Sequence, residues 1–373
     1  MTQDIQTVKI GFIPLVDCAL LVIAKEKGFA QNEGIDLQLF KEVSWANIRD
    51  KVYLGYLDGA QMLAGMPIAA NMGLMQTACE IVAPFVLGRN GNAITVSHPV
   101  FANMQNEDPD FLKAFDLKRT GAALKAVVAR RKKEGQPILR FGMVFPFSCH
   151  YYHLRYWMAA CGIEPDVDVH LEVIPPPFMD QYLGEGRIDG FCVGEPWSSL
   201  VVAQDIGVIV GATTQIWSRC PEKLLGLRKD WIDNNPIALQ GLIKALHQSS
   251  VWAGDMSNME ELSQILSTHN YIDVPAELII RALTGDVRLQ KGQPKIHIPD
   301  FLTLSGRGAN YPDPGEGQWI LAQMERWGQA NGAHCQQEGM NLAFCADLYE
   351  KVLPSSAQDV QLAPKIILFD DIK

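Results

Sequence analysis

The chain contains 373 residues, of which 48% are hydrophobic and 20% are charged, so it is long enough and apolar enough for a globular protein of two domains. Its net charge of −10 argues against a nucleic-acid-binding protein, because such surfaces are basic. No apolar stretch approaches the ~20 residues of a membrane-spanning helix, which argues against an integral membrane protein.

The first strand-like segment, residues 8–13, begins close to the start of the chain. The residues before it contain no basic region, apolar region or cleavage site of the kind that directs secretion. The sequence as written therefore predicts a cytoplasmic protein, with a protein that has lost its signal as the alternative. The eight cysteines form no Cys-x-x-Cys pair, which is typical of reduced, buried thiols and indicates neither a disulfide framework nor a metal site.

One structural unit occurs twice along the chain. In the first copy, a strand at residues 8–13 leads through a turn with Pro14 into an apolar helix that ends near Gly28. In the second copy, a strand at residues 139–144 leads through Pro146 into a helix with one apolar face. Each copy continues with an alternating strand, a Tyr-Leu-Gly sequence, an Asp-Gly pair and a third strand followed by a proline-opened helix. We therefore predict two copies of a β-α-β-α-β unit.

Alternating strands and helices predict an α/β fold with two lobes, each built on a parallel or mixed sheet covered by helices. The expected crossings between the lobes are the strands at 93–97 and 208–213. The first lobe would then comprise residues 1–95 and 209–373, with a helical extension at its C-terminal end, and the second lobe residues 96–208. A ligand is expected in the cleft between the lobes.

The turn of the second copy brings Ser148, Cys149 and His150 to the start of a helix that ends at Gly162. Unpaired backbone N–H groups and the helix dipole favour a small anion at such a position. His150 adds a hydrogen-bond donor whose charge can change near neutral pH. The alternative is that His150 only caps its own first turn.

Five short motifs occur together and in order along the chain: Ser44-Trp45 with Arg49-Asp50, Met66-Pro67, Leu154-Arg155-Tyr156-Trp157, Gly194-Glu195-Pro196-Trp197 and Pro221-Glu222-Lys223. As a set they resemble the nitrate and bicarbonate solute-binding proteins of ABC transporters, and the resemblance covers most of the chain. It implies a bilobed fold of the type II periplasmic-binding-protein class, which agrees with the duplicated unit. It also implies a binding protein that has no cofactor and is not an enzyme.

The resemblance implies, in addition, which residues contact the anion. Asn92 stands where transport proteins of the family typically have glutamine, and this shorter side chain leaves both nitrate and nitrite open as ligands. The nitrate-binding residues implied in this way are Trp45, Asn92, His150, Pro176, Glu195 and Lys223.

The chemistry of nitrate fits this set, because a planar monovalent anion needs one positive charge and directed donors. Lys223 can supply the charge, and the other donors are His150, Asn92 and the Trp45 indole. With one lysine and no arginine cluster, the site should prefer monovalent planar anions to sulfate or phosphate. Other interpretations stay open. Trp45 could cover a hydrophobic patch, and Asn92 could be a turn residue. Lys223 could lie at the surface, and Glu195 could interact with a helix dipole.

Within this family, the start of the chain resembles that of cytoplasmic nitrate/nitrite sensors of the NasS type. The resemblance implies an RNA-binding transcription antiterminator of the NasT type as partner, held by the empty sensor and released when nitrate binds. One alternative is the substrate-binding component of a nitrate or bicarbonate ABC transporter. Another is a pyrimidine-precursor synthase on the same fold, which is least favoured because the sequence contains no glycine-rich phosphate loop and no nucleophile elbow.

Overall fold

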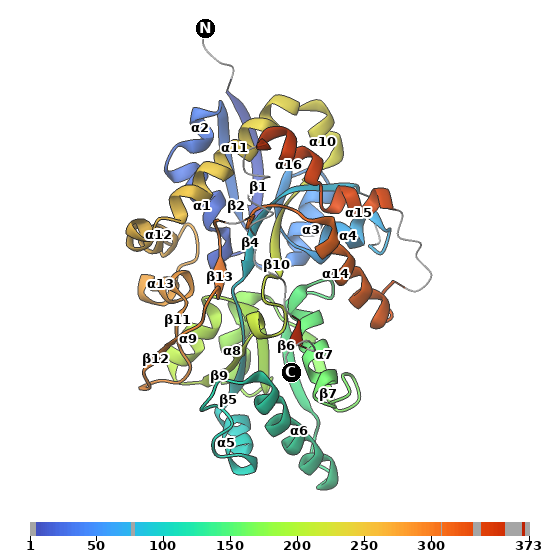
Figure 1. The fold of residues 1–373 in the computed structure, drawn as a ribbon, viewed down its shortest axis with the longest axis vertical. Coiled ribbons are helices and arrows are strands. Elements are labelled where there is room, and N and C mark those ends of the chain that lie inside the picture. Colours follow the sequence, from blue (N-terminus) through green and yellow to red (C-terminus); the bar gives the residue numbers. More distant parts are fainter. Residues whose placement is uncertain (1–4, 76–78, 307, 331–336, 355–367, 370–373) are drawn as a thin grey trace.

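The computed structural model describes residues 5–75, 79–306, 308–330, 337–354 and 368–369, which form two lobes, each built on one β-sheet (Figure 1). The first strand of the chain lies in one lobe, and the second sheet lies at the opposite end of the long axis. Within these ranges, no helix combines the length and the apolar character needed to cross a membrane.

The first sheet has six strands, and its central strand β10 runs against its neighbours. β1 pairs in parallel with β2 and β3, whereas β10 is antiparallel to β3 and β4. In sheet order the strands are β13 (Leu302–Thr303), β4 (Ile81–Asn90), β10 (Pro221–Arg228), β3 (Gly59–Leu63), β1 (Gln6–Phe12) and β2 (Ile35–Lys41). The helices of this lobe are α1 (Ala19–Glu26), α2 (Phe29–Asn32), α3 (Trp45–Tyr53), α4 (Gly65–Asn71), α10 (Lys229–Asn234) and α11 (Pro236–Ala253).

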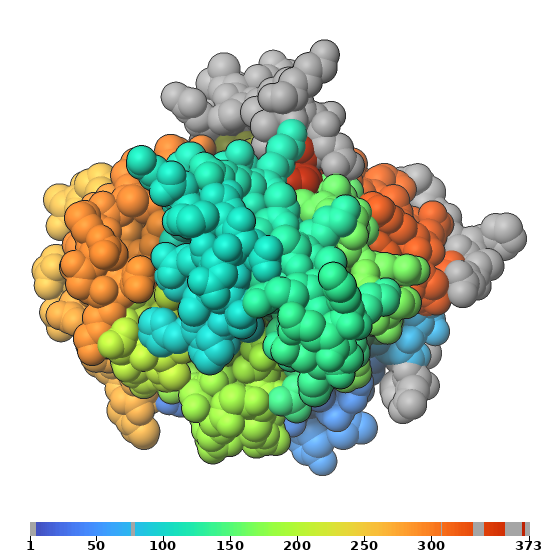
Figure 2. Space-filling view, turned by 90° about the horizontal axis from the view of Figure 1, so that it is seen from below, coloured from blue at the N-terminus to red at the C-terminus, as the bar shows by residue number. Residues whose placement is uncertain are grey.

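The second sheet has five strands. In order they are β7 (Val169–Val173), β6 (Leu139–Met143), β8 (Gly190–Gly194), β5 (Asn92–Ser97) and β9 (Gly207–Ala212). The helices of this lobe are α5 (His98–Glu107), α6 (Leu117–Lys133), α7 (Cys149–Ala160), α8 (Met179–Gly184) and α9 (Trp197–Gln204). Figure 2 shows the molecule from the end of this lobe, where α5 and α6 cover the centre of the surface.

The two sheets repeat one arrangement of strands. β1 lies between β2 and β3 with both pairs parallel, and β6 lies between β7 and β8 in the same way. Gly11 of β1 is opposite Ala60 of β3, and Gly142 of β6 is opposite Phe191 of β8. The predicted duplication of a β-α-β-α-β unit is therefore confirmed.

The chain crosses between the sheets at two places. It passes from β4 to β5 at Gly91 and returns from β9 to β10 through η3 (Thr213–Gln215). Asn90 and Gly91 have φ angles of 58° and 83°, a left-handed conformation that glycine and asparagine tolerate best. β5 and β9 pair with each other within the second sheet. The lobe boundaries at residues 95 and 209 remain a prediction.

The later part of the chain adds helices that pack on both lobes. These elements are η4 (Met256–Asn258), α12 (Met259–Leu266), α13 (Ala276–Thr284), β11 (Asp286–Arg288), β12 (Lys295–His297), α14 (Pro314–Arg326), α15 (Gln337–Ala343) and α16 (Ala346–Val352). The rings of Trp319 on α14 and Tyr156 on α7 lie 5.7 Å apart. α7 packs against β8 as well as against α14, so every residue from Cys149 to Met158 is buried, and the prediction of a single apolar face is wrong.

Candidate functional site

A completely buried lysine, Lys223 of β10, lies between the two sheets. Its Nζ is 3.0 Å from Asp17 Oδ2 and 2.9 Å from Glu222 Oε1. The same nitrogen is 5.6 Å from the centre of the Trp45 ring. The interpretation of Lys223 as a surface lysine is therefore wrong. Its burial is tolerated because two carboxylates and an aromatic face surround the ammonium group.

The carboxylate of Glu222 is the centre of this group. It accepts hydrogen bonds from Asn92 Nδ2 at 2.7 Å and from Lys223 Nζ at 2.9 Å. Its Oε1 also lies 3.3 Å from His150 Nδ1. Asn92 is the first residue of β5 and His150 lies in the first turn of α7, so both come from the lobe of the second sheet. The structure thus brings three of the predicted anion-binding residues together around one planar carboxylate.

An irregularity in β10 places Glu222 and Lys223 in the same group. Neighbouring residues of a strand normally point to opposite faces of the sheet. The pairing of β10 with β4 shifts in register on either side of Lys223, and such shifts change the direction of side chains. Glu222 was not predicted as a site residue, although it stands in the same motif as Lys223, because the residue pattern does not reveal the register shift.

On the side of the first sheet, Gln61 holds the Asp17 carboxylate that faces Lys223. Gln61 Nε2 donates to Asp17 Oδ1 at 2.5 Å, and Gln61 Oε1 accepts from the Ile13 N–H at 2.9 Å. Asp17 lies on η1 (Val16–Cys18) and Gln61 on β3, and both are buried. Neither residue was predicted from the sequence. The available signal was a single polar residue within an otherwise apolar run, as Asp17 is between Val16 and Cys18.

Several buried polar atoms at this site have no hydrogen-bond partner among the described residues. They are Trp45 Nε1, Asn92 Oδ1 and both ring nitrogens of His150. Leaving such an atom unsatisfied costs about 1–3 kcal/mol, so groups of them mark a place for a ligand. His150 does not cap its helix, because the Ser148 hydroxyl oxygen accepts from the Tyr151 N–H at 3.1 Å. Its imidazole is therefore available to donate to a bound molecule.

Glu195 and Pro176 are not joined to this group. Glu195 Oε2 accepts from the Ser199 N–H at 3.1 Å, at the start of α9, as the helix-dipole interpretation expects. The backbone of Glu195 joins the lobes, since its N–H donates to Gly91 O and its carbonyl accepts from the Val16 N–H, both at 2.9 Å. Pro176 is buried at the start of η2 (Pro176–Phe178). Within the described part of the chain, no hydrogen bond or ion pair links either side chain to Lys223.

Burial controls the charges at the site. Burial lowers the pKa of His150 well below its usual range, and the charges of Lys223 and His153 lower it further, so the imidazole is neutral. Burial also raises the pKa of Glu222 to about 7. Burial acts to lower the pKa of Lys223, but the carboxylates of Asp17 and Glu222 raise it above its usual value. One ammonium group, which stays charged, is thus shared by two carboxyl groups.

Two buried thiols lie beside this group. The side chains of Cys149, Cys220 and Glu222 approach one another closely enough to hold a metal ion, and no other such set occurs in the ranges that the structure describes. The sequence predicted no metal site, because these residues are far apart along the chain.

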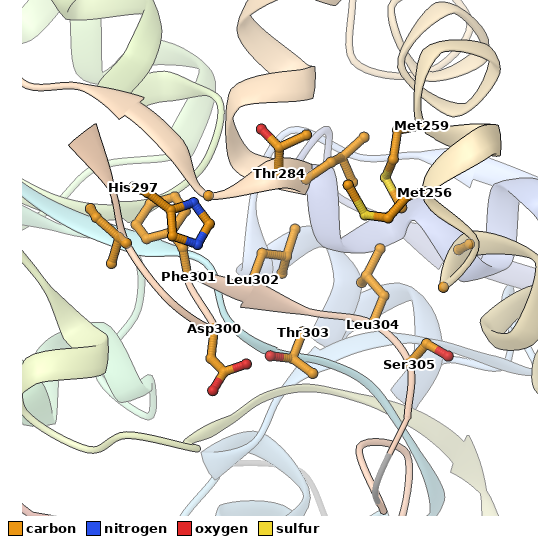
Figure 3. Close-up of a pocket in the computed structure, with 15 residues that line it drawn as sticks. Met256, Met259, Thr284, His297, Asp300, Phe301, Leu302, Thr303, Leu304 and Ser305 are labelled. Atoms are coloured by element: carbon orange, nitrogen blue, oxygen red, sulfur yellow. The ribbon is translucent and has the colours of Figure 1, made fainter. Parts of the chain in front are cut away.

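A separate cavity of about 200 Å³ lies in the first lobe, between η4, α13 and β13 (Figure 3). Met256 and Met259 line one side of it, with Leu302 and Leu304 opposite. This cavity shares no residue with the group around Lys223. The predicted anion-binding donors therefore belong to the junction of the sheets and not to this cavity.

Comparisons with known proteins identify relatives over most of the chain. Residues 2–267 match the NMT1-like family. The chain is 35% identical over 351 residues to the nitrate/nitrite binding protein NrtA of Nostoc sp. (strain PCC 7120), a match that covers 92% of this chain and 76% of the relative. It is 38% identical over 324 residues to the nitrate import ATP-binding protein NrtC of Synechocystis sp. (strain PCC 6803). It is 36% identical over 323 residues to the bicarbonate transport ATP-binding protein CmpC of Synechococcus elongatus (strain PCC 7942).

The matches to NrtC and CmpC each cover 86% of this chain but only 46% and 45% of those proteins, so the chain spans about half the length of these two relatives. The crystal structure of the periplasmic nitrate-binding protein NrtA from Synechocystis PCC 6803 superposes with a TM-score of 0.88 at 30% identity, covering 99% of this chain and 95% of that one. The predicted bilobed type II periplasmic-binding-protein fold is therefore confirmed. Because the NrtA relatives are binding proteins, the prediction that the chain is not an enzyme is confirmed as well.

Proposed function

The chain belongs to the NMT1-like family of nitrate and bicarbonate solute-binding proteins, and from that premise we propose that it binds a small, planar, monovalent oxyanion in the group around Lys223. The ligand class is nitrate, nitrite or bicarbonate. The names of the relatives favour a role as the substrate-binding component of an ABC importer over a role as a sensor.

The observation that supports this proposal is the position of the Glu222 carboxylate. A carboxylate is planar and singly charged, and its two oxygens here accept from Asn92 Nδ2 and Lys223 Nζ, with His150 Nδ1 at 3.3 Å. Nitrate and bicarbonate present oxygens in the same planar arrangement. A donor set that holds one such group internally suits an external one of the same shape, which would take the place of Glu222.

The charges of the site favour a monovalent ligand. Lys223 is the positive charge of this group and already faces two carboxyl groups, Asp17 and Glu222. Sulfate or phosphate would add two negative charges to this buried group, which is costly without further compensation. The predicted preference for monovalent anions thus has a stronger basis than a count of lysines alone.

The test is a calorimetric titration of the purified chain with nitrate, nitrite, bicarbonate and sulfate. We expect one site per chain for at least one of the three planar anions and weak or no binding of sulfate. Tight binding of sulfate alone, or no binding of any planar anion, would refute the proposal.

A sensor role remains a second, narrower hypothesis. The resemblance to sensors of the NasS type implies a protein that holds a NasT-type antiterminator when empty and releases it on binding nitrate. An anion held between Lys223 of one lobe and His150 of the other favours the closed arrangement, and a partner that prefers the open one must then lower anion affinity by the same factor. Measuring nitrate affinity with and without such an antiterminator tests this role. A stable complex with unchanged nitrate affinity would contradict it.

A further inference from the structure

Two buried thiols face each other across the junction of the lobes. Cys149 begins α7 in the lobe of the second sheet, and Cys220 directly precedes β10 of the first. Both side chains are completely buried, and each sulfur lies 3.6 Å from the carbonyl oxygen of Pro221. The two sulfurs lie within 4.8 Å of each other. They are therefore a matched pair from distant parts of the chain and not two unrelated core cysteines.

A carboxylate completes a set of three potential metal ligands. The sulfurs of Cys149 and Cys220 and a carboxylate oxygen of Glu222 all lie within 4.8 Å of one another. We propose that these three side chains form a binding site for a thiophilic divalent cation of the zinc class. Two sulfurs and one oxygen are the ligands that zinc accepts, whereas calcium and magnesium require oxygen ligands alone.

The size of the triangle fits an ion of this kind. At the centre of an equilateral triangle with 4.8 Å sides, an ion would lie ~2.8 Å from each ligand atom, and zinc needs ~2.3 Å to sulfur and ~2.1 Å to oxygen. Because 4.8 Å is the upper limit of the separations, shifts of at most about 0.5–0.7 Å in the ligand atoms close that difference. On binding, both thiols lose their protons to solvent and become thiolates, so the cation and its two sulfur ligands are neutral together.

A separate observation points to the same place. The ring of His150 is completely buried, neither of its nitrogens has a hydrogen-bond partner among the described residues, and Nδ1 lies 3.3 Å from Glu222 Oε1. Neutral imidazole is a common zinc ligand. Its nitrogens lie outside the 4.8 Å set, so His150 would become the fourth ligand of a tetrahedral set after its side chain moves toward the two sulfurs. Because Cys149 and His150 come from one lobe and Cys220 and Glu222 from the other, a bound ion would link the two lobes.

The test measures metal alone, without any anion, so its outcome does not depend on the proposed function. The full chain is purified, freed of metal with a chelator under reducing conditions and titrated with zinc. It is then titrated with cobalt, whose absorption spectrum reports thiolate ligands directly. Cys149→Ser and Cys220→Ser are compared with Cys18→Ser, which changes another completely buried cysteine outside the cluster.

We expect one ion per chain and a sulfur-to-cobalt charge-transfer band in the unchanged chain and in Cys18→Ser. In Cys149→Ser and Cys220→Ser the band should disappear and zinc affinity should fall by about a hundredfold. Losses up to this size are typical when only the groups around the metal ligands are changed, so loss of a ligand should cost at least as much. His150→Ala should retain the band with weaker zinc binding. No zinc binding, binding without the charge-transfer band, or equal binding by all three serine variants would overturn the proposal. Far-ultraviolet circular dichroism separates loss of a ligand from loss of the fold.

Discussion

The two copies of the duplicated unit place different chemistry at the same position. Counted from Gly11 and Gly142, which occupy equivalent places in β1 and β6, Asp17 corresponds to Ser148 and Ala19 corresponds to His150. In the first copy the helix start is a 3-10 turn without a side-chain cap, and Asp17 is free to pair with Lys223. In the second copy Ser148 caps α7, and the next turn presents Cys149 and His150.

This difference shows how one scaffold gives the two sides of the junction separate roles. The first copy supplies the carboxylate that keeps a lysine charged in a buried place. The second supplies a neutral donor, His150, whose ring nitrogens have no hydrogen-bond partner within the described ranges. The residues that follow β3 and β8 also differ, because Glu195 follows β8, whereas Ala64 follows β3. Substitutions at these positions test the differences one residue at a time.

Replacing Lys223 should have the largest effect. Its ammonium group pairs with Asp17 of the first copy and with Glu222, whose carboxylate lies beside His150 of the second copy. Lys223→Met leaves the carboxyl groups of Asp17 and Glu222 buried without a cation, so we expect the free energy of unfolding to fall by about 3–5 kcal/mol. Binding of planar anions should be lost. Urea unfolding and calorimetry measure the two effects.

The matched control is Lys132→Met, which removes an exposed lysine paired with Asp168 at 2.9 Å. Exposed pairs contribute about 0–1 kcal/mol, so this variant should remain close to the unchanged chain. Equal losses in the two variants would contradict the buried role of Lys223.

Glu195 should make stability depend on pH. Burial raises its pKa to about 7 from an ordinary value of 4.5, so the folded chain keeps a proton that the unfolded chain has released. The free energy of unfolding should therefore fall as the pH rises from 4.5 to about 7 and stay level above that. At ~1.4 kcal/mol per pKa unit, this residue contributes a loss of at most about 3–4 kcal/mol.

Glu195→Gln removes this contribution, so the difference between the two stability curves isolates it from the other carboxyl groups. Urea unfolding between pH 4.5 and 8 is the measurement. Parallel curves for the two proteins would show that Glu195 is not the residue responsible.

His150→Ala makes the second copy resemble the first, which has Ala19 at this position. If the imidazole donates to the anion, affinity for the preferred planar anion should fall by about 1–3 kcal/mol. The fold should persist, because Ser148 and not His150 caps the helix. Calorimetric titration gives the affinity and urea unfolding the stability. Unchanged affinity with lowered stability would assign His150 a structural role only.

Removing the cap of α7 should have the smallest effect. Ser148→Ala removes the hydroxyl that accepts from the Tyr151 N–H, which typically costs about 1 kcal/mol of stability. Anion affinity should change little, since no donor of the group is lost. A larger loss of affinity than of stability, from the same two measurements, would show that the helix start itself contacts the anion.

Much of this arrangement could be predicted from the sequence, for definite reasons. The duplicated unit follows from periodicity, glycines and prolines, and the helix start at Ser148 follows from a polar residue after a strand. The burial of α7 on all sides could not be predicted, because it depends on Trp319 of α14, more than 150 residues further along the chain.

The candidate site was predicted in part. Lys223 and Asn92 were identified through the family resemblance, since residue type alone would place a lysine at the surface. His150 was predicted from its position at a helix start, and the resemblance implied the same residue. Glu222 was missed because the register shift in β10 redirects it, and Asp17 because a single acidic residue in an apolar run gives no partner. The pairing of Cys149 with Cys220 depends on how the lobes meet, which local sequence does not encode.

The central claim is that an external anion takes the place of the Glu222 carboxylate among the donors around Lys223. Calorimetric titration of the unchanged chain and of Glu222→Gln with its preferred planar anion tests this most directly. An uncharged amide competes less well for Lys223 and Asn92, so the variant should bind that anion more tightly, by about 1–2 kcal/mol, or roughly five- to thirtyfold. Equal or weaker binding by Glu222→Gln would contradict the claim and place the anion elsewhere.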